Sequence, residues 1–216
     1  MMYFTDFPEE GPRVRPHPGW LMDEEGGSRL LTDAELAEHG FRLVIYRPPA
    51  FDADRERVET RPLTQWLVSA TTAIVAYQVA TLPVQEVGAR KLAAIDQERN
   101  GILSAGYPVP GTSLHIDMSD GTRADLGAVA VTALVVKAGA LAWPEGYAHG
   151  WITMENERLP LPTPDDGIGL AYGVGAFYSV VVQHGRTLKD SVLALIAADD
   201  IEGILAIDAS AGWPTP

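Results

Sequence analysis

The chain has 216 residues, a formal net charge of −13 and no cysteine. Without cysteine it can form no disulfide, thiolate nucleophile or zinc–cysteine site. So acidic a chain repels phosphate backbones, and we expect no nucleic acid among its partners. It also lacks a run of 18 apolar residues, which disfavours a membrane-spanning helix, and its first residues do not have the pattern of a signal peptide.

Residues 1–20 mix proline, glycine and charged residues without periodicity, and we expect an extended arm there. Pro12, Pro16 and Pro18 favour extended backbone. Such an arm could lie on a partner protein or form a free terminus, and the sequence is compatible with both.

Residues 21–83 have the pattern of a small β-rich domain. Within it, 31–39 is a helix signal, because Thr32 and Glu35 have the spacing of a capping box and Gly40 follows as a stop. Alternating or β-branched stretches at 41–46, 57–60, 63–68 and 72–80 predict strands. The simplest assembly is a small antiparallel sheet with one short helix.

Residues 84–101 predict a helix that connects the two halves and stops at Gly101. We expect an α+β helical domain at 102–216, with strands at 113–118, 150–154 and 157–161. A long apolar helix at 122–142 has Thr122 as its expected N-cap. The predicted fold class is therefore α+β: a small N-terminal β-rich domain, a connecting helix, and a C-terminal domain of helices with a short antiparallel sheet.

The C-terminal stretch predicts three further helices. The first starts at the cap Thr163, with Pro164 in its first position, and runs to a stop at Gly185, where His184 would cap its end. The second spans 188–196, and a shorter third, at 201–205, follows a possible cap at Asp199 and Asp200. Neither of the last two helices is long enough to be stable alone in water, so their apolar faces must pack against other parts of a protein.

Few residues suggest a cofactor-binding, metal-binding or catalytic site. The stretch 167–175, GIGLAYGVG, has the spacing GxGxxxG and follows two aspartates, which would repel a pyrophosphate. His115 and Asp117 could hold a metal together with His149, although a solvated His–Asp pair is far commoner. The hydrolase elbow, the P-loop and HExxH are absent. We therefore expect no enzyme, no cofactor, and no catalytic or metal-binding residues.

Five residues are candidates for contact with a protein partner. Gly169 and Gly173 share one helix face and would let another helix approach closely. Trp20, Phe177 and Trp213 are aromatic residues of the kind that anchor interfaces. The tryptophans are equally suited to anchoring the cores of two small domains.

An ordered series of short motifs in residues 90–214 resembles a domain of unknown function found in tail and tail-fibre proteins of tailed bacteriophages. The motifs are ARKLAAIDQERNG, LHIDMSDGTRADL, the pair Trp143-Pro144, the W-x-x-x-x-N pattern at Trp151, and the closing stretch from Leu188 to Pro214. The stretch from Leu31 to Val87 is similar to the small β-rich segment that precedes such domains, but it has Arg61-Pro62 where a D-G turn is usual.

This resemblance implies a structural component of a phage tail, at the tail tip, baseplate or fibre attachment. Its partners would be other tail proteins, and several copies would form a symmetric assembly. The chain would be made in the host bacterial cytoplasm and reside in the virion tail. One alternative is a tail-fibre assembly chaperone that the virion does not retain; another is a protein that binds or hydrolyses host glycans. The resemblance supplies no catalytic residues.

Overall fold

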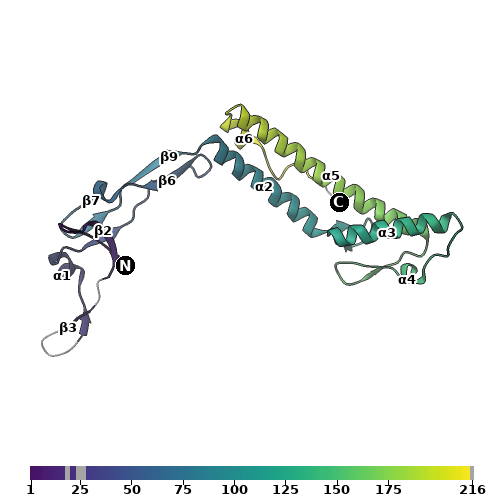
Figure 1. Ribbon diagram of the computed structural model, residues 1–216, viewed down its shortest axis with the longest axis horizontal. Helices are drawn as coiled ribbons and strands as arrows, with labels where there is room; N and C mark the ends of the chain where they lie inside the picture. Colours follow the sequence, from purple (N-terminus) through teal and green to yellow (C-terminus); the bar gives the residue numbers. More distant parts are fainter. Residues whose placement is uncertain (18–19, 23–27, 215–216) are drawn as a thin grey trace. The chain divides into compact units, whose positions relative to one another are not determined.

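The computed structural model describes residues 1–17, 20–22 and 28–214, and these form an α+β protein, as expected. They divide into two compact units, Met1–Pro83 and Val84–Pro216. The first unit holds most of the strands and the second most of the helices (Figure 1). Each unit has a hydrophobic core of its own.

The first unit is built on a five-stranded sheet with the order β2-β1-β5-β8-β7. Its strands are β1 (Met2–Phe7), β2 (Gly11–Pro16), β5 (Arg42–Ile45), β7 (Leu67–Val68) and β8 (Thr72–Ile74). Two further pairs are antiparallel: β3 (Trp20–Met22) with β4 (Ser28–Leu30), and β6 (Glu56–Thr60) with β9 (Tyr77–Thr81). Phe4, Val44, Trp66, Ala73 and Val75 form the core of this unit.

Four expectations for this unit need correction. Residues 2–16 are not an extended arm, because β1 and β2 pair along their whole length and β1 continues the sheet onto β5. The sheet is not wholly antiparallel, since β5 and β8 run parallel. The strand expected at 63–68 is a 3-10 turn, η1 (Leu63–Gln65), followed by β7, and the strand expected at 72–80 is two strands in different sheets. The short helix α1 (Asp33–Glu38) has the expected capping box of Thr32 and Glu35.

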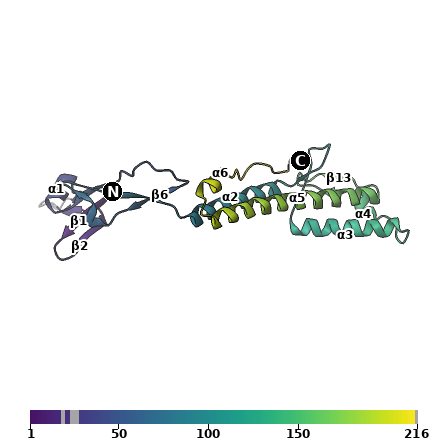
Figure 2. The ribbon, with the colours of Figure 1, turned by 90° about the horizontal axis from the view of Figure 1, so that it is seen from above.

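The second unit consists of helices around one long helix. Its elements are α2 (Val84–Ala105), β10 (Tyr107–Pro108), β11 (His115–Ile116), α3 (Asp120–Lys137), α4 (Glu145–Ala148), β12 (Trp151–Ile152), β13 (Arg158–Leu159), α5 (Pro164–Ala197) and α6 (Ile201–Ala206). α5 is central: α2 packs along its C-terminal half and α3 along its N-terminal half (Figures 1 and 2).

The helix expected to connect the two halves is an integral part of this second unit. α2 continues past Gly101 to Ala105 and is tied to α5 by the Lys189–Asp96 ion pair, with 2.5 Å between Nζ and Oδ1. Gly88 allows the close packing, because a Cβ there would lie 2.3 Å from Cδ1 of Ile196. α6 closes the same end with the fully buried Ile204, and Asp200 caps it as expected.

The break expected at Gly185 is absent, and residues 164–197 form one continuous helix. Gly185 is buried inside α5, where the ring of Trp213 and the side chain of Arg99 cover it. His184 therefore caps no helix end; its Nε2 lies 3.0 Å from the carbonyl oxygen of Ala211. Packing by these side chains compensates for the low helix propensity of glycine.

Candidate protein-docking surface

The start of α3 is fixed by a local network of hydroxyl and carboxylate groups. Ser119 is the N-cap, and its Oγ accepts a hydrogen bond from the backbone N–H of Thr122 at 3.3 Å. Thr122, the expected cap, instead lies in the first turn and donates from Oγ1 to Asp117 at 2.8 Å. Hydrogen bonds from Ser119 and Thr122 hold the pKa of Asp117 below its usual value. The network thus joins the first turn of α3 to the segment that directly follows β11 (His115–Ile116).

The start of α5 has Thr163 as its N-cap, as predicted, and Asp166 completes a capping box that the sequence prediction did not include. The backbone N–H of Thr163 donates to Asp166 Oδ2 at 2.9 Å, and the backbone N–H of Asp166 donates back to Thr163 Oγ1 at 3.3 Å. Pro164 takes the first helical position, where its missing N–H costs no hydrogen bond. The two aspartates at this end also suit the positive end of the helix dipole.

α3 packs antiparallel on the N-terminal half of α5. The inner face of α3 is formed by Leu126, Val129 and Ala133, all of them almost fully buried. Gly167 of α5 permits the close approach, because a Cβ there would lie 3.0 Å from Cγ1 of Val129. An ion pair between Lys137 and Asp165 joins the C-terminal end of α3 to the N-terminal end of α5.

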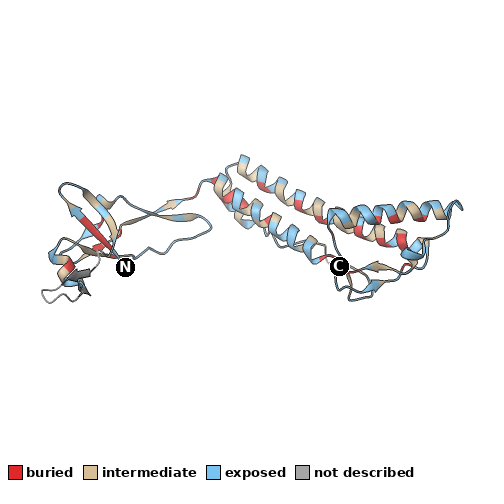
Figure 3. Cartoon of the chain, turned by 60° about the horizontal axis from the view of Figure 1, so that its bottom comes forward, coloured by how far each residue is buried: buried red, intermediate tan, exposed pale blue. Residues whose placement is uncertain are grey.

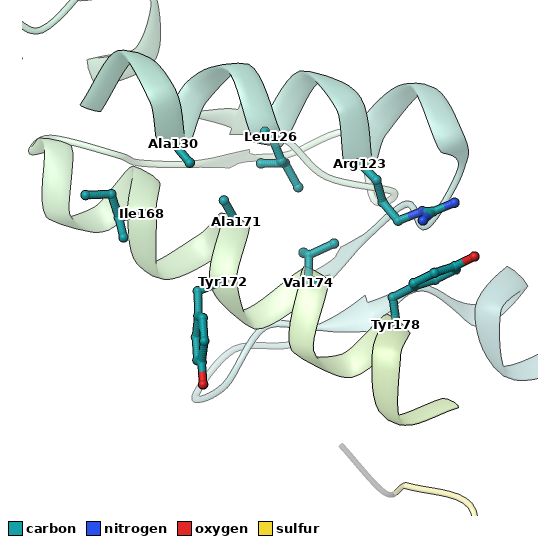
Figure 4. Close-up of a pocket in the computed structure, with 10 residues that line it drawn as sticks. Arg123, Leu126, Ala130, Ile168, Ala171, Tyr172, Val174 and Tyr178 are labelled. Atoms are coloured by element: carbon teal, nitrogen blue, oxygen red, sulfur yellow. The ribbon is translucent and has the colours of Figure 1, made fainter. Parts of the chain in front are cut away.

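A groove of about 390 Å³ runs between the two helices on their outer side (Figure 4). Nine of its ten lining residues carry no formal charge; the ten are Arg123, Leu126, Gly127, Ala130, Ile168, Ala171, Tyr172, Val174, Gly175 and Tyr178. At one end the guanidinium of Arg123 stacks on the ring of Tyr178, 3.6 Å from its centroid. Tyr172, which is 77 % exposed, is the most accessible large apolar side chain in the groove.

The outer face of α3 carries an exposed apolar stripe that is continuous with this groove through Gly127. The stripe residues recur every three or four positions; they are Ala124, Gly127, Ala128, Val131, Leu134 and Val135. Val131 is 62 % exposed and Leu134 is 60 % exposed, although both lie in the middle or last third of an ordered helix. Exposed positions recur along α3 in Figure 3. A row of apolar residues left open to water is typical of a surface that other protein covers.

The sequence prediction missed this stripe, although the signal was present. Residues 126, 129 and 133 give α3 one apolar face, and 124, 128, 131 and 135 give it another. A helix that is apolar on two faces can bury both only against two packing partners, and α5 is the partner of only one face. The predicted partner contacts lie instead on α5, near the N-terminus at Trp20, and at Trp213 after α6.

Among the residues expected to contact a partner, three are half-buried and pack against other residues of the chain. Gly173 lies under Tyr107, since a Cβ there would come within 2.5 Å of the Tyr107 hydroxyl oxygen. Phe177 packs against the same tyrosine, with 5.6 Å between ring centroids. Trp213 makes an edge contact with the ring of His184, with 4.7 Å between centroids, and its Nε1 donates to the carbonyl oxygen of Ala209.

The other two expected residues lie elsewhere. Gly169 is exposed and borders a second hollow, of about 370 Å³, which Tyr107, Asp165 and Asp166 also line. Trp20 begins β3, and its side chain lies outside the described residues. The structure therefore does not gather these residues into one partner surface.

The histidines and carboxylates that could have formed a metal site are apart and otherwise engaged. Nδ1 of His115 lies 2.8 Å from Oε1 of Glu155, whereas Asp117 belongs to the α3 cap, and His149 lies 3.4 Å from Glu145. Within the part of the chain that the structure describes, no three such side chains come together in a metal-binding arrangement. None of the helices in that part has the length and apolar character needed to cross a membrane.

Residues 86–211 match a protein-family model, which is described as domain of unknown function DUF4376. The match begins in the first turn of α2 and ends beyond α6, so it contains the groove and the stripe of α3. No curated protein and no solved structure matches the chain. Because the matched region is more than half of the sequence, the chain belongs to the DUF4376 family.

Proposed function

We propose that the chain is a non-enzymatic structural component of a bacteriophage tail, at the tail tip, baseplate or fibre attachment, and that it works by docking to other proteins. The observation that carries the docking part is the exposed apolar stripe of α3, which is contiguous with the α3–α5 groove. The phage part rests on the motif order in residues 90–214, which resembles a domain of tail proteins.

The surface has the properties of a docking site rather than of a reactive one. Its groove is lined by aliphatic and aromatic side chains and by small residues, and its one charged group, Arg123, is engaged by Tyr178 and by the carbonyl oxygen of Met118. Aromatic and aliphatic side chains in the centre of a contact supply most of its binding energy. We therefore place other tail proteins on this face, and neither nucleic acid nor membrane.

Quantitative mass spectrometry of purified virions tests this proposal. In a phage that encodes the chain, we expect its peptides at a fixed ratio to those of a known tail protein. A phage-encoded protein that is absent from virions serves as the control for carry-over from the lysate. Presence in infected cells but absence from virions would contradict the structural role and favour the tail-fibre chaperone.

A second test addresses the surface itself. Phage carrying Leu134→Asp, which places a charge on the stripe, should yield particles that lack the chain. Phage carrying Val180→Asp, at an exposed α5 position outside the groove, should incorporate it normally. Saturable binding of the purified chain to a host glycan, with no effect of Leu134→Asp on incorporation, would contradict docking through α3.

A further inference from the structure

We infer that β9 (Tyr77–Thr81) pairs antiparallel with β9 of a second copy of this chain, around a two-fold axis at Val79. The pairing joins two β6–β9 ribbons into one four-stranded sheet with the order β6-β9-β9-β6. This inference concerns the first unit and rests neither on the proposed function nor on the α3–α5 groove. It follows from the backbone groups that β9 leaves without a partner.

β9 lies at an edge that the chain leaves unprotected. Edge strands present unpaired backbone N–H and C=O groups, and proteins usually shield them with proline, with charge or by keeping the strand short. β2 carries Pro12 and Pro16, and β7 has only two residues, so both edges of the five-stranded sheet are shielded. β9 has five residues with neither proline nor charge, and no charged residue lies between Arg61 and Glu86. Within the described residues β9 pairs with β6 alone.

The ladder between β6 and β9 determines which groups of β9 face outward. At one end the backbone N–H of Leu82 donates to the carbonyl oxygen of Arg55 at 2.7 Å. At the other end the backbone N–H of Arg61 donates to the carbonyl oxygen of Ala76 at 2.9 Å. Hydrogen-bonded pairs alternate in an antiparallel ladder, so every second residue of β9 bonds to β6 and the others point their backbone groups away from it. The outward residues are Tyr77, Val79 and Thr81.

This unpaired run is symmetric about Val79, and both of its ends are defined. On one side the next outward residue is Val75, whose N–H donates to the carbonyl oxygen of Ile45 at 3.0 Å. On the other side it is Pro83, which has no N–H. Each lies four positions from Val79, so Pro83 faces Val75 of the second copy and neither has an N–H left to pair. Two copies therefore use the whole run, and each outward residue exchanges two hydrogen bonds with the residue opposite.

The side chains fit the same register. Val79 meets Val79 of the second copy on the axis, and Val58 lies opposite Val79 within each ribbon, so a row of valines crosses the four-stranded sheet. Tyr77 faces Thr81 of the second copy, and aromatic side chains opposite β-branched ones stabilise antiparallel strands. No like charges meet, because β9 carries none. A two-stranded ribbon is only marginally stable by itself, and the pairing gives it two more strands.

The mass of the full-length protein in solution is the first test, by size-exclusion chromatography with light scattering. We expect the wild type at twice the chain mass of 23.2 kDa. Val79→Pro should run at the single-chain mass, because it removes an outward N–H and blocks the outer ladder while sparing the bonds to β6. Val58→Pro is the matched control: it alters the opposite edge of the same ribbon and should leave the dimer intact.

Val79→Lys provides a second variant that keeps the backbone N–H. Val79 is 41 % exposed, so a lysine there can reach solvent in the single chain. Two ammonium groups on the axis should raise the dimer dissociation constant about tenfold at low salt and less at high salt. Circular dichroism should show unchanged secondary structure in all three variants. A wild type at the single-chain mass at about 100 µM, or a wild-type dissociation constant in Val79→Lys, would overturn the inference.

Hydrogen exchange locates the contact. The backbone amides of Tyr77, Val79 and Thr81 should exchange slowly at concentrations at which the dimer forms, and fast after dilution to the single chain. The outward amides of Val58 and Thr60, on the other edge of the ribbon, should exchange fast at both concentrations. A dimer in which the three β9 amides still exchange fast would be held by another surface and would refute the pairing.

Cysteine pairs test the register, and the natural chain has no cysteine to interfere. Gln78 faces Ala80 of the second copy in a pair without backbone hydrogen bonds, where Cα atoms lie about 4.5 Å apart and suit a disulfide. Under mild oxidation the double variant Gln78→Cys with Ala80→Cys should give a disulfide-linked dimer, whereas neither substitution alone should. Efficient cross-linking of Gln78→Cys alone would place the axis at another residue and refute this register.

Discussion

Tyr107 lies against Gly173, so close that a Cβ on this glycine would be 2.5 Å from the tyrosine hydroxyl oxygen and 3.0 Å from its Cζ. Tyr107 cannot simply turn away, because its ring also packs on Phe177. The glycine therefore serves packing within the unit: it lets β10 (Tyr107–Pro108) lie on α5. Four residues earlier on the same face, Gly169 has no neighbouring atom within 4 Å of the same position.

This contrast predicts opposite effects of one substitution at two positions. Gly173→Ala should lower the free energy of unfolding by about 1–3 kcal/mol, because Tyr107 must move out of its packing. Gly169→Ala should raise it by up to about 1 kcal/mol, because alanine favours the helix and nothing obstructs its methyl group. Urea denaturation followed by circular dichroism measures both. Equal stabilisation by the two substitutions would show that Tyr107 does not rest on Gly173.

Trp213 holds the C-terminal segment against α5, and its removal should destabilise the second unit. The indole contacts His184 and covers Gly185, while its Nε1 donates to Ala209 at 2.8 Å. We expect Trp213→Ala to lower the free energy of unfolding by about 2 kcal/mol, since a half-buried aromatic ring is lost. Trp213→Phe keeps a ring but not the hydrogen bond and should cost about 1 kcal/mol.

Thermal denaturation of the purified variants provides this measurement. The sequence offered Trp213 as a partner contact, and virion incorporation can be measured on the same variants. Should Trp213→Ala leave stability unchanged and yet prevent incorporation into virions, the indole would face a partner rather than α5.

The sequence was most informative where the determinants of structure are local. The capping box at Thr32 and the N-cap at Thr163 involve groups within three residues, and both are present as predicted. The cap of α3 shows the limit of such reasoning, because Ser119 and Thr122 both have the right chemistry. Both hydroxyls donate to Asp117, but Ser119 is the cap because its Oγ accepts the backbone N–H of Thr122, and only the folded geometry shows this.

Features that depend on distant residues were mostly missed. Gly185 was interpreted as a helix stop, but Trp213, 28 positions later, covers it and lets α5 continue. The parallel pairing of β5 (Arg42–Ile45) with β8 (Thr72–Ile74) likewise joins segments far apart in the chain. The candidate surface falls between these cases: the apolar pattern of α3 was visible, but which face α5 covers was not.

In the first unit, the buried phenol of Tyr3 should resist ionisation at high pH. Its hydroxyl donates to Asp33 Oδ1 at 2.8 Å, and burial together with this hydrogen bond raises the pKa of Tyr3 to about 12. The folded-state pKa lies above the ordinary tyrosine value of 10.0, so the stabilisation is complete below pH 10 and is lost as the pH rises toward 12. Ultraviolet titration should therefore show one tyrosine ionising about two pH units after exposed ones.

Tyr3→Phe should remove this late ionisation and lower the free energy of unfolding at neutral pH by about 1 kcal/mol, because the hydrogen bond is lost. Tyr46→Phe is the matched control, since Tyr46 is exposed, and it should change neither quantity. If the late phase persisted in Tyr3→Phe, another tyrosine would be responsible for it.

At the opposite end of the pH scale, Glu155 should govern part of the acid stability of the second unit. Its Oε2 accepts the backbone N–H of His115 at 2.9 Å and its Oε1 lies 2.8 Å from Nδ1 of the same residue, so one carboxylate joins β11 to the turn after β12. The backbone hydrogen bond from His115, followed by the bond to its ring, lowers the pKa of Glu155 to about 2.

Because this pKa lies below the ordinary glutamate value of 4.5, the stabilisation is present above pH 4.5 and is lost as the pH falls toward 2. Glu155→Gln should therefore be less stable than the wild type at pH 7, and the difference should shrink steadily between pH 4.5 and pH 2. Chemical denaturation at pH 7, 4 and 3 measures it, with Glu157→Gln, an exposed neighbour, as the control. A difference between wild type and Glu155→Gln that is the same at all three pH values would mean that the carboxylate charge contributes nothing to holding His115.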